Sequence, residues 1–381
     1  MRNKMRLGDI ATLITKGTTP TSVGYTFTDT GVNFVKIESI REDGTFIPDK
    51  FAHISDECNT KLKRSQLQEN DILFSIAGAI GRTAIVTKDC LPANTNQALA
   101  IIRIPQGVID YRFLLYALQS DAIIEQAEKQ KQGVAQLNLS LQNINDFEIP
   151  FFTEEEQLTV VEVLSSVDSL LSTRIAQLEQ LDELVKSRFI ELFGDGHDGK
   201  APTKMLGSIC KFQQGTQIPV EEQFEEQISG YKRFLRIIDY TQAPQPPRYV
   251  NVNGKEVDEK SVVIVRYGAT AGFVGRGYQG ILANNLFEIM PDETILSKDF
   301  LFLALKYGTF EKEVHDKAFG AAMPALSFSM MNDIPVVVPM AEQQSQFVSF
   351  VEQTDKSKLA VQQSIAELEE LKKSLMQKYF G

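Results

Sequence analysis

An internal repeat constrains the fold of this chain more than any other feature, because the second half restates the first about 200 residues later. The matches keep their order: LGDI (7–10) with LGSI (206–209), FVKIESI (34–40) with FLRIIDY (234–240), SIAGAIGRTAIV (75–86) with VRYGATAGFVG (265–275), YRFLLYAL (111–118) with KDFLFLAL (298–305), and GVAQLNLSLQNINDFEIP (133–150) with GAAMPALSFSMMNDIPVVVP (320–339). Each copy then closes with a long helical pattern and the pair Phe-Gly. The repeat predicts two similar domains, each followed by a helix.

The first helical pattern starts after Pro150 and continues for about 40 residues, roughly 60 Å of helix. Thr153 and Glu156 have the spacing of a capping box, which predicts the beginning of the helix. No proline or glycine interrupts residues 154–193. Apolar residues recur every seven positions at Leu164, Leu171, Leu178, Val185 and Leu192, with Val167, Ile175, Leu181 and Phe189 between them. This heptad predicts one long helix with a narrow apolar seam.

The second helical pattern follows Pro339 and has a rougher heptad. Its apolar positions are Phe347, Val351, Val361, Ile365, Leu368, Leu375 and Tyr379. Lys358 and Lys372 stand where the first copy has apolar side chains. Because a narrow seam on so long a helix needs another helix to cover it, we expect an antiparallel intramolecular coiled coil. The alternative is two unrelated amphipathic helices on separate globules.

Each globular part mixes short β-branched runs with one helical patch. Strands are predicted at 33–37, 71–76, 83–86 and 98–104 with a helix over 110–130, and again at 233–238, 261–267 and 286–290 with a helix over 298–313. A Gly-Ala pair follows a strand in both copies, at 78–79 and 268–269, which predicts a tight turn.

The predicted fold class is therefore α+β: two similar α/β domains separated by two long helices that form a pseudo-twofold symmetric pair. The predicted boundaries are 1–152 for the first domain, 153–193 for the first long helix, 194–202 for a linker, 203–340 for the second domain and 341–381 for the second long helix.

The net charge of −11, taken as a total, argues against a nucleic-acid partner. However, residues 151–199 carry three basic and eleven acidic residues, so a net −8 of that charge lies on the first long helix and the linker. The domains themselves are close to neutral, and each can present a basic face to DNA.

Motifs for catalysis, metals and cofactors are missing from the sequence. GRGYQG (275–280) matches a dinucleotide-binding pattern, but a strand-like segment follows it where such a site needs a helix. No run of 18 apolar residues occurs, the start lacks the apolar core of a signal peptide, and three scattered cysteines fit a reducing cytosol. We expect a cytoplasmic, non-catalytic protein with no membrane segment, metal or cofactor.

The repeated motifs together resemble the specificity subunits of type I restriction-modification systems over essentially the whole chain. The motifs that carry the resemblance are the duplicated L-G-x-I start with Gly-Thr soon after, the Gly-Ala turn with its Asn-rich strand (Asn94, Asn96, Gln97; Asn284, Asn285), the G-x-x-x-x-x-L-S stretch (Gly133 to Ser140; Gly320 to Ser327) and E-x-Q before each helix (Glu155 to Gln157; Glu342 to Gln344). One departure is Gly320-Ala-Ala-Met-Pro-Ala, which replaces the family's usual Gln-x-Asn before Leu-Ser.

The resemblance implies a function for each part. Each globule would be a target-recognition domain that reads one half of an asymmetric, bipartite double-stranded DNA sequence. The helices would set the spacing and dock two adenine-methyltransferase (M) subunits, and restriction and translocation (R) subunits would join through the complex. S-adenosylmethionine would then bind the M subunit rather than this chain.

Basic and amide side chains in predicted loops are the candidates for DNA contacts, because such groups read base edges and bind phosphates. The candidates are Thr18, Thr19, Lys36, Arg41, Lys61, Lys63, Arg64, Arg82, Asn96, Thr216, Gln217, Lys232, Arg233, Arg236, Arg266, Tyr267, Arg276 and Asn284. The candidate helix seam is Leu164, Leu171, Leu178, Val185, Val361, Ile365, Leu368 and Leu375.

Three other interpretations stay open. A coiled-coil scaffold with two protein-binding globules would explain the acidic helix. An enzyme with an unrecognised active site would need activity from the chain alone. A specificity subunit from a switching locus would have the same sequence features as an active one.

Overall fold

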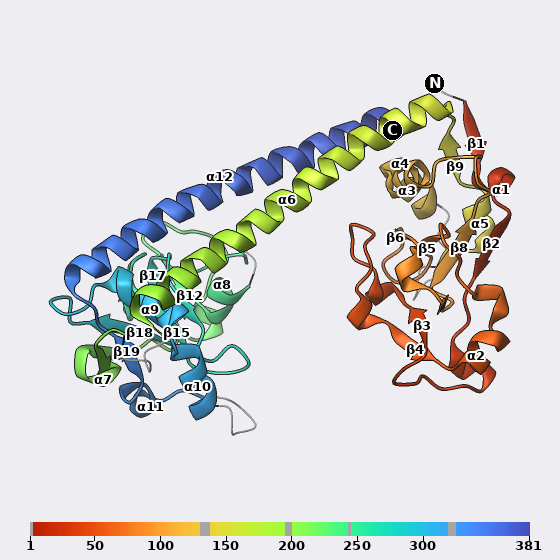
Figure 1. The fold of residues 1–381 in the computed structure, drawn as a ribbon. Coiled ribbons are helices and arrows are strands. Elements are labelled where there is room, and N and C mark those ends of the chain that lie inside the picture. The colour runs from red at the N-terminus through yellow and green to blue at the C-terminus, as the bar shows by residue number, and fades with distance from the viewer. Residues whose placement is uncertain (1–2, 130–137, 195–199, 243–244, 319–324) are drawn as a thin grey trace. The chain divides into compact units, whose positions relative to one another are not determined.

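The computed structural model describes residues 3–129, 138–194, 200–242, 245–318 and 325–381, and it separates into two compact units (Figure 1). Unit 1 contains residues 1–174 and 364–381, and unit 2 contains residues 175–363. Each unit therefore combines one copy of the repeat with a part of both long helices. No helix among the described residues is long and apolar enough to cross a membrane.

Unit 1 begins with the first globular repeat. Its strands are β1 (Lys4–Arg6), β2 (Leu13–Lys16), β3 (Val32–Val35), β4 (Ala52–Ile54), β5 (Ile72–Ser75), β6 (Thr83–Ile85), β7 (Ala93–Thr95), β8 (Leu99–Arg103) and β9 (Glu148–Pro150). Its α-helices are α1 (Leu7–Ile10), α2 (Asp56–Lys61), α3 (Tyr111–Gln119), α4 (Asp121–Lys129) and α5 (Leu141–Asn145), before the long helix α6 (Glu154–Phe193). The strands form the sheets β2-β8-β5-β6, β4-β3-β7 and β1-β9.

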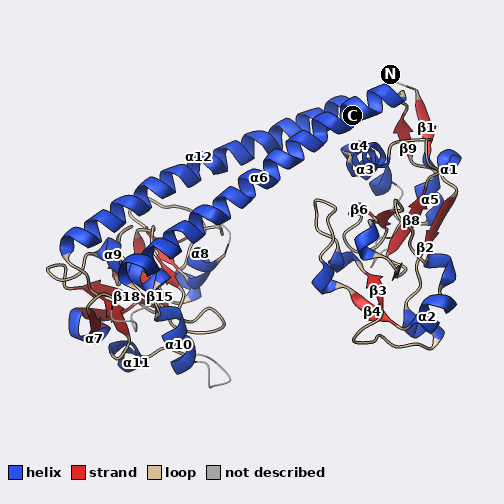
Figure 2. Ribbon diagram, viewed as in Figure 1, coloured by secondary structure: helices blue, strands red, loops and turns tan. Residues whose placement is uncertain are grey.

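Unit 2 repeats this plan. Its strands are β10 (Thr203–Met205), β11 (Cys210–Gln214), β12 (Lys232–Leu235), β13 (Arg248–Val250), β14 (Glu256–Val257), β15 (Val262–Val265), β16 (Val274–Gly275), β17 (Gly280–Leu282), β18 (Leu286–Pro291) and β19 (Pro335–Val337). Its α-helices are α7 (Leu206–Ile209), α8 (Ile237–Thr241), α9 (Lys298–Tyr307), α10 (Phe310–Ala318) and α11 (Phe328–Asn332), before the long helix α12 (Ala341–Phe380). The sheets β11-β18-β15-β16, β13-β12-β17-β14 and β10-β19 correspond to those of unit 1 (Figure 2).

Sheet topology is shared in detail between the two units. In both units, the strand before the Gly-Ala turn lies inside an antiparallel sheet. In unit 1 this strand is β5, which pairs with β8 and β6, and in unit 2 it is β15, which pairs with β18 and β16. In both, the second sheet contains one parallel pair, β3 with β7 and β12 with β17. The predicted fold class is confirmed: two similar domains that mix helices and strands, each followed by a long helix.

The two long helices pack against each other in opposite directions within each unit. In unit 1, Asp168 of α6 contacts Lys372 of α12, with 2.6 Å between Oδ1 and Nζ. In unit 2, Asp182 contacts Lys358, also at 2.6 Å. Residue numbers rise along α6 as they fall along α12, so the expected antiparallel pair is confirmed.

The seam between the helices matches the predicted positions in part. Leu164, Val185 and Val361 are buried, and Leu171, Leu178, Ile365, Leu368 and Leu375 are partly buried. Ile175 and Leu192 do not belong to the seam, because their side chains are 50% and 39% exposed. The seam of an α-helix drifts around its axis relative to a strict seven-residue repeat, so the outlying heptad positions leave the interface.

Three local predictions were wrong. The helices over 110–130 and 298–313 are each two helices, broken where Ser120 takes an extended conformation (ψ 151°) and after α9 at Gly308. The strand expected at 233–238 ends at Leu235, and α8 begins at Ile237. A β-branched run fits both a strand and a short buried helix, so its composition does not place the boundary.

Lys358 should make the stability of unit 2 depend on alkaline pH. Burial lowers the pKa of Lys358, but its hydrogen bond to Asp182 and the charge of that carboxylate outweigh this and raise the pKa above its usual value. A raised pKa in the folded state means that the charged pair stabilises the fold below pH of about 10.4 and stops doing so as the pH rises through the folded pKa.

We therefore expect the wild type to lose stability relative to Lys358→Met as the pH rises from about 10 to 12. Urea unfolding of both proteins across this range is the measurement, with Lys356→Met, at an exposed position two residues away, as the control. A stability difference that stays constant with pH contradicts the prediction.

Candidate nucleic-acid interface

Two loops that the sequence singled out separately lie together in unit 1. The Gly-Thr loop after β2 approaches the Asn-rich segment after β7, and the Thr18 amide donates to the Thr95 carbonyl at 3.1 Å. The Thr19 hydroxyl donates to the Gln97 side chain. Gly17 allows this approach, because a Cβ there would lie 1.9 Å from the Thr95 carbonyl oxygen. Thr18, Thr19 and Asn96 therefore share one small surface of loops.

Unit 2 has the same arrangement. The Thr216 amide donates to the Leu282 carbonyl at 2.7 Å, and the Asn284 amide donates to the Gln217 side chain at 3.4 Å. A Cβ at Gly215 would lie 2.1 Å from the Ala283 carbonyl oxygen, so glycine is needed here as well. The structure thus brings Thr216, Gln217 and Asn284 together on the surface that corresponds to the one in unit 1.

The arginines beside the Gly-Ala turns mainly contact their own domain. Both turns begin with a glycine of positive φ, Gly78 (70°) and Gly268 (86°), which fits the tight turn predicted at each Gly-Ala pair. The Arg82 guanidinium donates to the Ile40 carbonyl at 3.0 Å. Arg266 donates to the Leu326 carbonyl at 3.3 Å and stacks over the ring of Tyr267 at 4.6 Å.

The basic cluster of the second domain surrounds a buried carboxylate. Asp239 accepts from Arg236 at 3.0 Å and from Arg233 at 3.2 Å, and its side chain is fully buried. Lys232 pairs with Glu256. A buried carboxylate is costly unless a basic side chain pairs with it, so Arg233 and Arg236 stabilise the fold by pairing with Asp239, whether or not they also contact DNA.

Three further candidates also have contacts within their own domain. Lys36 lies 4.5 Å over the ring of Phe27. Arg41 is exposed and donates to the Phe46 carbonyl at 3.0 Å. Arg276 pairs with Asp299 at 3.0 Å.

Lys61, Lys63 and Arg64 form the most accessible basic cluster among the candidates. They lie at the end of α2 and in the 3₁₀ turn Lys63–Ser65, all three are exposed, and none has an ion-pair partner within the described parts of the chain. Free, solvated cations on one turn suit phosphate contacts, because no internal partner has to be given up.

Replacing Lys61, Lys63 and Arg64 together by Gln should weaken binding to all DNA sequences alike. The slope of log K against log salt should fall in magnitude by up to about 2.7, because each lost phosphate contact removes about 0.9. Fluorescence anisotropy of the complex from 50 to 200 mM salt measures both quantities, with Lys356→Gln on α12 as the control. An unchanged slope would remove this cluster from the interface.

The E-x-Q motif has a structural function that sequence reasoning missed. Gln157 is buried, accepts from the Asp110 amide at 2.9 Å and donates to the Phe152 carbonyl at 2.9 Å. Gln344 does the same with the Ser297 amide at 3.0 Å and the Pro339 carbonyl at 2.9 Å. Each glutamine ties the start of a long helix to the loop that begins α3 or α9.

The Leu-Ser motif also has a structural function. Leu139 and Leu326 are buried, and Ser140 and Ser327 accept an amide hydrogen bond as N-caps of α5 and α11. The earlier parts of this motif, 133–137 and 320–324, lie outside the described residues, as do linker residues 195–199.

Buried ion pairs inside the domains were missed as well. Arg103 binds Asp71 through two hydrogen bonds of 2.7 Å, and Lys255 pairs with Glu288. Asp71 stands directly before the apolar residues of β5. An acidic residue next to a buried strand is only a weak indication in the sequence that its carboxylate is buried and paired with a basic side chain.

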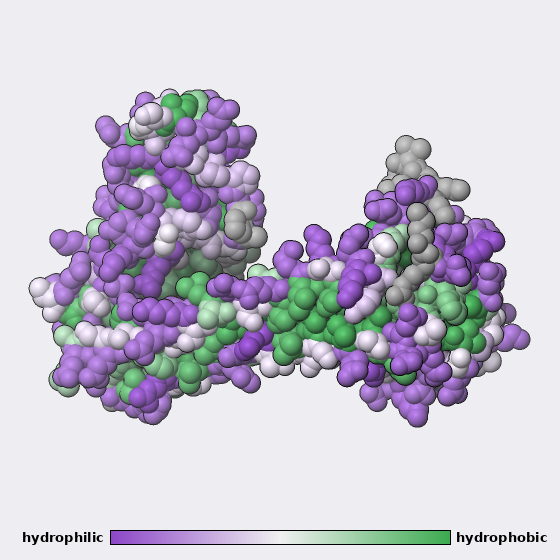
Figure 3. Space-filling model, turned by 90° about the horizontal axis from the view of Figure 1, so that it is seen from above, coloured by the Kyte–Doolittle hydropathy of each residue, from purple (hydrophilic) through white to green (hydrophobic). Residues whose placement is uncertain are grey.

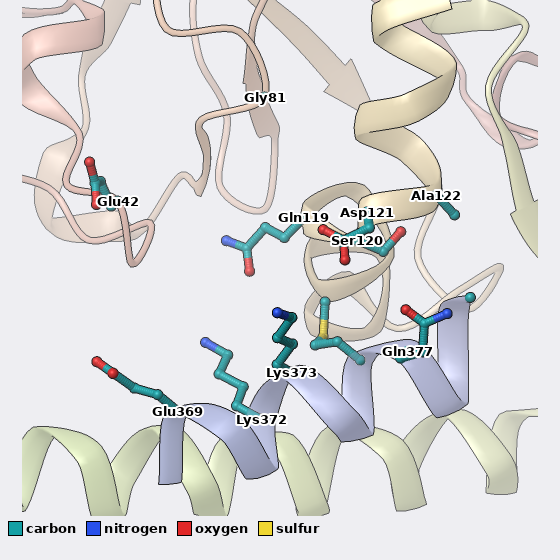
Figure 4. Close-up of a pocket in the computed structure, with 12 residues that line it drawn as sticks. Glu42, Gly81, Gln119, Ser120, Asp121, Ala122, Glu369, Lys372, Lys373 and Gln377 are labelled. Atoms are coloured by element: carbon teal, nitrogen blue, oxygen red, sulfur yellow. The ribbon is translucent and has the colours of Figure 1, made fainter. Parts of the chain in front are cut away.

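A hollow of about 380 Å³ lies between α12 and the α3–α4 junction of unit 1 (Figure 4). Gln119 faces Lys373 across it, while Lys372 is held by Asp168, which also accepts from the Tyr116 hydroxyl at 2.7 Å. Burial and this hydrogen bond raise the pKa of Tyr116, so its hydroxyl stays protonated. None of the DNA candidates lines this hollow, which we interpret as a packing feature.

The type I restriction modification DNA specificity domain matches this chain twice, over residues 2–180 and 201–370. The chain therefore belongs to the family of type I restriction-modification specificity subunits, the non-catalytic subunits that give such systems their DNA specificity.

Three relatives from Methanocaldococcus jannaschii show how far the similarity extends. The MjaIX specificity subunit is 23% identical over 84% of this chain and 78% of its own length. The putative MjaX specificity subunit is 23% identical over 97% and 90%. The MjaVIII specificity subunit is 24% identical, but the match covers 46% of this chain and only 40% of that relative.

Two solved structures share the fold. One, from work on complex assembly and conformational transition of the type I R-M system, has a TM-score of 0.66 at 18% identity and covers 99% of this chain and 97% of that one. The S subunit of a type I restriction-modification system from M. genitalium has a TM-score of 0.55 at 17% identity and covers 100% and 96%.

Proposed function

We propose that each globular repeat reads one half of an asymmetric, bipartite DNA target. The observation that carries this proposal is the repeated loop surface, where the Gly-Thr loop meets an asparagine loop in both units. The backbone is the same, but the side chains differ: Thr18-Thr19 with Asn96-Gln97 in one, and Thr216-Gln217 with Asn284 in the other. Similar surfaces with different side chains suit two different half-sites. The DNA candidates and the domain boundaries given above belong to this proposal.

The long helices are the proposed docking surface for two M subunits, to which R subunits add. Both helices expose large apolar side chains in each unit, such as Leu170 and Leu371 in unit 1 and Leu184 and Leu359 in unit 2. Figure 3 shows hydrophobic residues at the surface of the long helices. These four side chains are 47–64% exposed, so the helix pair leaves part of its apolar surface in water. Contact with partner helices would cover them.

Selection from a DNA library tests the proposal. The complex with its M subunits should enrich two different short motifs at one fixed spacing, and the chain alone should bind weakly because its domains are nearly neutral. A scaffold that binds only proteins would enrich no sequence.

Lengthening both helices by one heptad should lengthen the gap between the two half-sites by about three base pairs. Seven residues inserted between Leu171 and Leu178, with seven between Gln362 and Glu369, keep the seam in register and add about 10.5 Å. The spacing of methylated half-sites is the readout. An unchanged spacing would show that the helices do not set it.

A further inference from the structure

Unit 2 contains a cavity of about 730 Å³, and a smaller hollow of about 380 Å³ is lined by the corresponding turn, residue Gly81, in unit 1. It lies between α8, the turn 268–275, α9 and α10. Its volume is in the range of small-molecule sites. Aromatic rings line it, including Tyr240, Phe273, Tyr278 and Phe302.

One side chain that lines the cavity differs between the two copies of the repeat. Arg82 and Phe273 are counterparts, since the carbonyl of each accepts a bond from the strand before the turn, at Ser75 (2.8 Å) and Val265 (3.0 Å). In unit 1 the Arg82 guanidinium turns inward and binds the Ile40 carbonyl at 3.0 Å. In unit 2 Phe273 is 42% exposed and leaves that space open.

A second change places a hydroxyl beside this space. Tyr240 is the counterpart of Ile40, and its ring packs on Gly275, where a Cβ would lie only 2.5 Å from it. The ring meets Tyr278 edge-on at 5.3 Å. The Tyr240 hydroxyl is buried and has no hydrogen-bond partner within the described residues. A buried hydroxyl without a partner costs about 1–3 kcal/mol, so a partner from outside the chain would be favourable.

Two basic side chains lie beside one of these aromatic rings, and one of them, Arg276, also pairs with Asp299. Arg276 lies 4.2 Å over the ring of Phe302, and Lys306 lies 5.9 Å from the same ring. Rings for stacking, a hydroxyl for a polar edge and cations for a phosphate are the groups that bind a nucleotide. Burial also raises the pKa of Tyr240, so its hydroxyl is available as a donor.

We propose that this cavity is a binding site for a nucleobase. The base could come from a free nucleotide or from an unstacked base of the bound DNA, and both present the same chemical groups. The second source rests on the proposed function. A damaged, mismatched or unpaired base would enter with the least cost.

Free nucleotides test the first source on the full chain alone. AMP, GMP, CMP and dTMP are titrated while saturation-transfer NMR and the melting temperature are followed. Tyr240→Phe keeps the ring and removes only the hydroxyl, so it should weaken binding about two- to tenfold, the size of one hydrogen bond, without lowering the ligand-free melting temperature. Tyr249→Phe in β13, outside the cavity, is the matched control and should change nothing.

Fluorescent DNA tests the second source in the complex with M subunits. 2-Aminopurine is placed in turn at each position of the half-site read by the second domain. The site predicts a rise in fluorescence at one position that Tyr240→Phe reduces and that the cavity-filling Ala271→Phe abolishes, while Tyr249→Phe leaves it unchanged. A rise that survives Ala271→Phe comes from elsewhere and counts against the site.

The two arms separate the site from the proposed function. Binding in either arm that depends on Tyr240 supports the site. If no nucleotide binds and no base signal depends on Ala271 and Tyr240, the site is wrong even though DNA is bound. If the complex binds no DNA at all, the proposed function fails, and the free-nucleotide arm alone decides the site.

Discussion

Exchange of residues 203–340 for the matching segment of a related specificity subunit changes one half of the methylated sequence and leaves the other half as it was. This is the expected result because all loops of the candidate surface in unit 2 lie within that segment, while Thr18, Thr19 and Asn96 lie in the first domain. Each mismatched base pair costs about 1–3 kcal/mol, so the original sites lose nearly all methylation.

Sequencing of methylated adenines in cells carrying the chimera is the measurement. The reciprocal exchange of residues 1–152 is the matched control and should change only the other half-site. If one exchange alters both halves, the domains do not read DNA independently.

Replacing Phe189 by Ala should destabilise unit 2 by about 3–5 kcal/mol. Phe189 is fully buried where α6, α9 and α12 meet, with ring centroids 5.3 Å from Phe193, 5.5 Å from Phe347 and 6.2 Å from Phe300. Its loss leaves a cavity among side chains from three helices that cannot collapse together.

Urea unfolding followed by circular dichroism measures the loss, and Ile190→Ala, next along α6 and 38% exposed, is the control. Two units need not unfold together, so unit 2 should unfold first in the variant while unit 1 keeps its midpoint. Equal destabilisation by both substitutions would contradict the packing described for Phe189.

The fold could be predicted where the signal is local and repeated. The two long helices follow from a heptad without proline or glycine, and the antiparallel pairing follows from a seam too narrow to stay uncovered. The Gly-Ala turns were also predictable, because a glycine after a strand marks a positive φ. The helix breaks at Ser120 and Gly308 were not, since neither residue forbids a helix.

Partners that are distant in the sequence account for what could not be predicted. In the sequence, Lys358 only interrupts the apolar heptad of the second long helix, because its partner Asp182 lies 176 residues away. The basic run around Arg236 suggested DNA contacts, while the buried Asp239 that binds Arg233 and Arg236 is visible only in the fold. Composition alone does not distinguish a basic side chain that pairs with a buried carboxylate from one that is exposed and able to bind a phosphate. The structure makes this distinction, because Lys61, Lys63 and Arg64 are exposed.

Methylated-base sequencing of cells with and without this chain, in the presence of the M subunits, tests the central claim most directly. The account predicts methylated adenines in one asymmetric motif, made of two different short sequences at a fixed spacing, that disappears when the chain is deleted. A palindromic or uninterrupted motif, or methylation that persists without the chain, would contradict it.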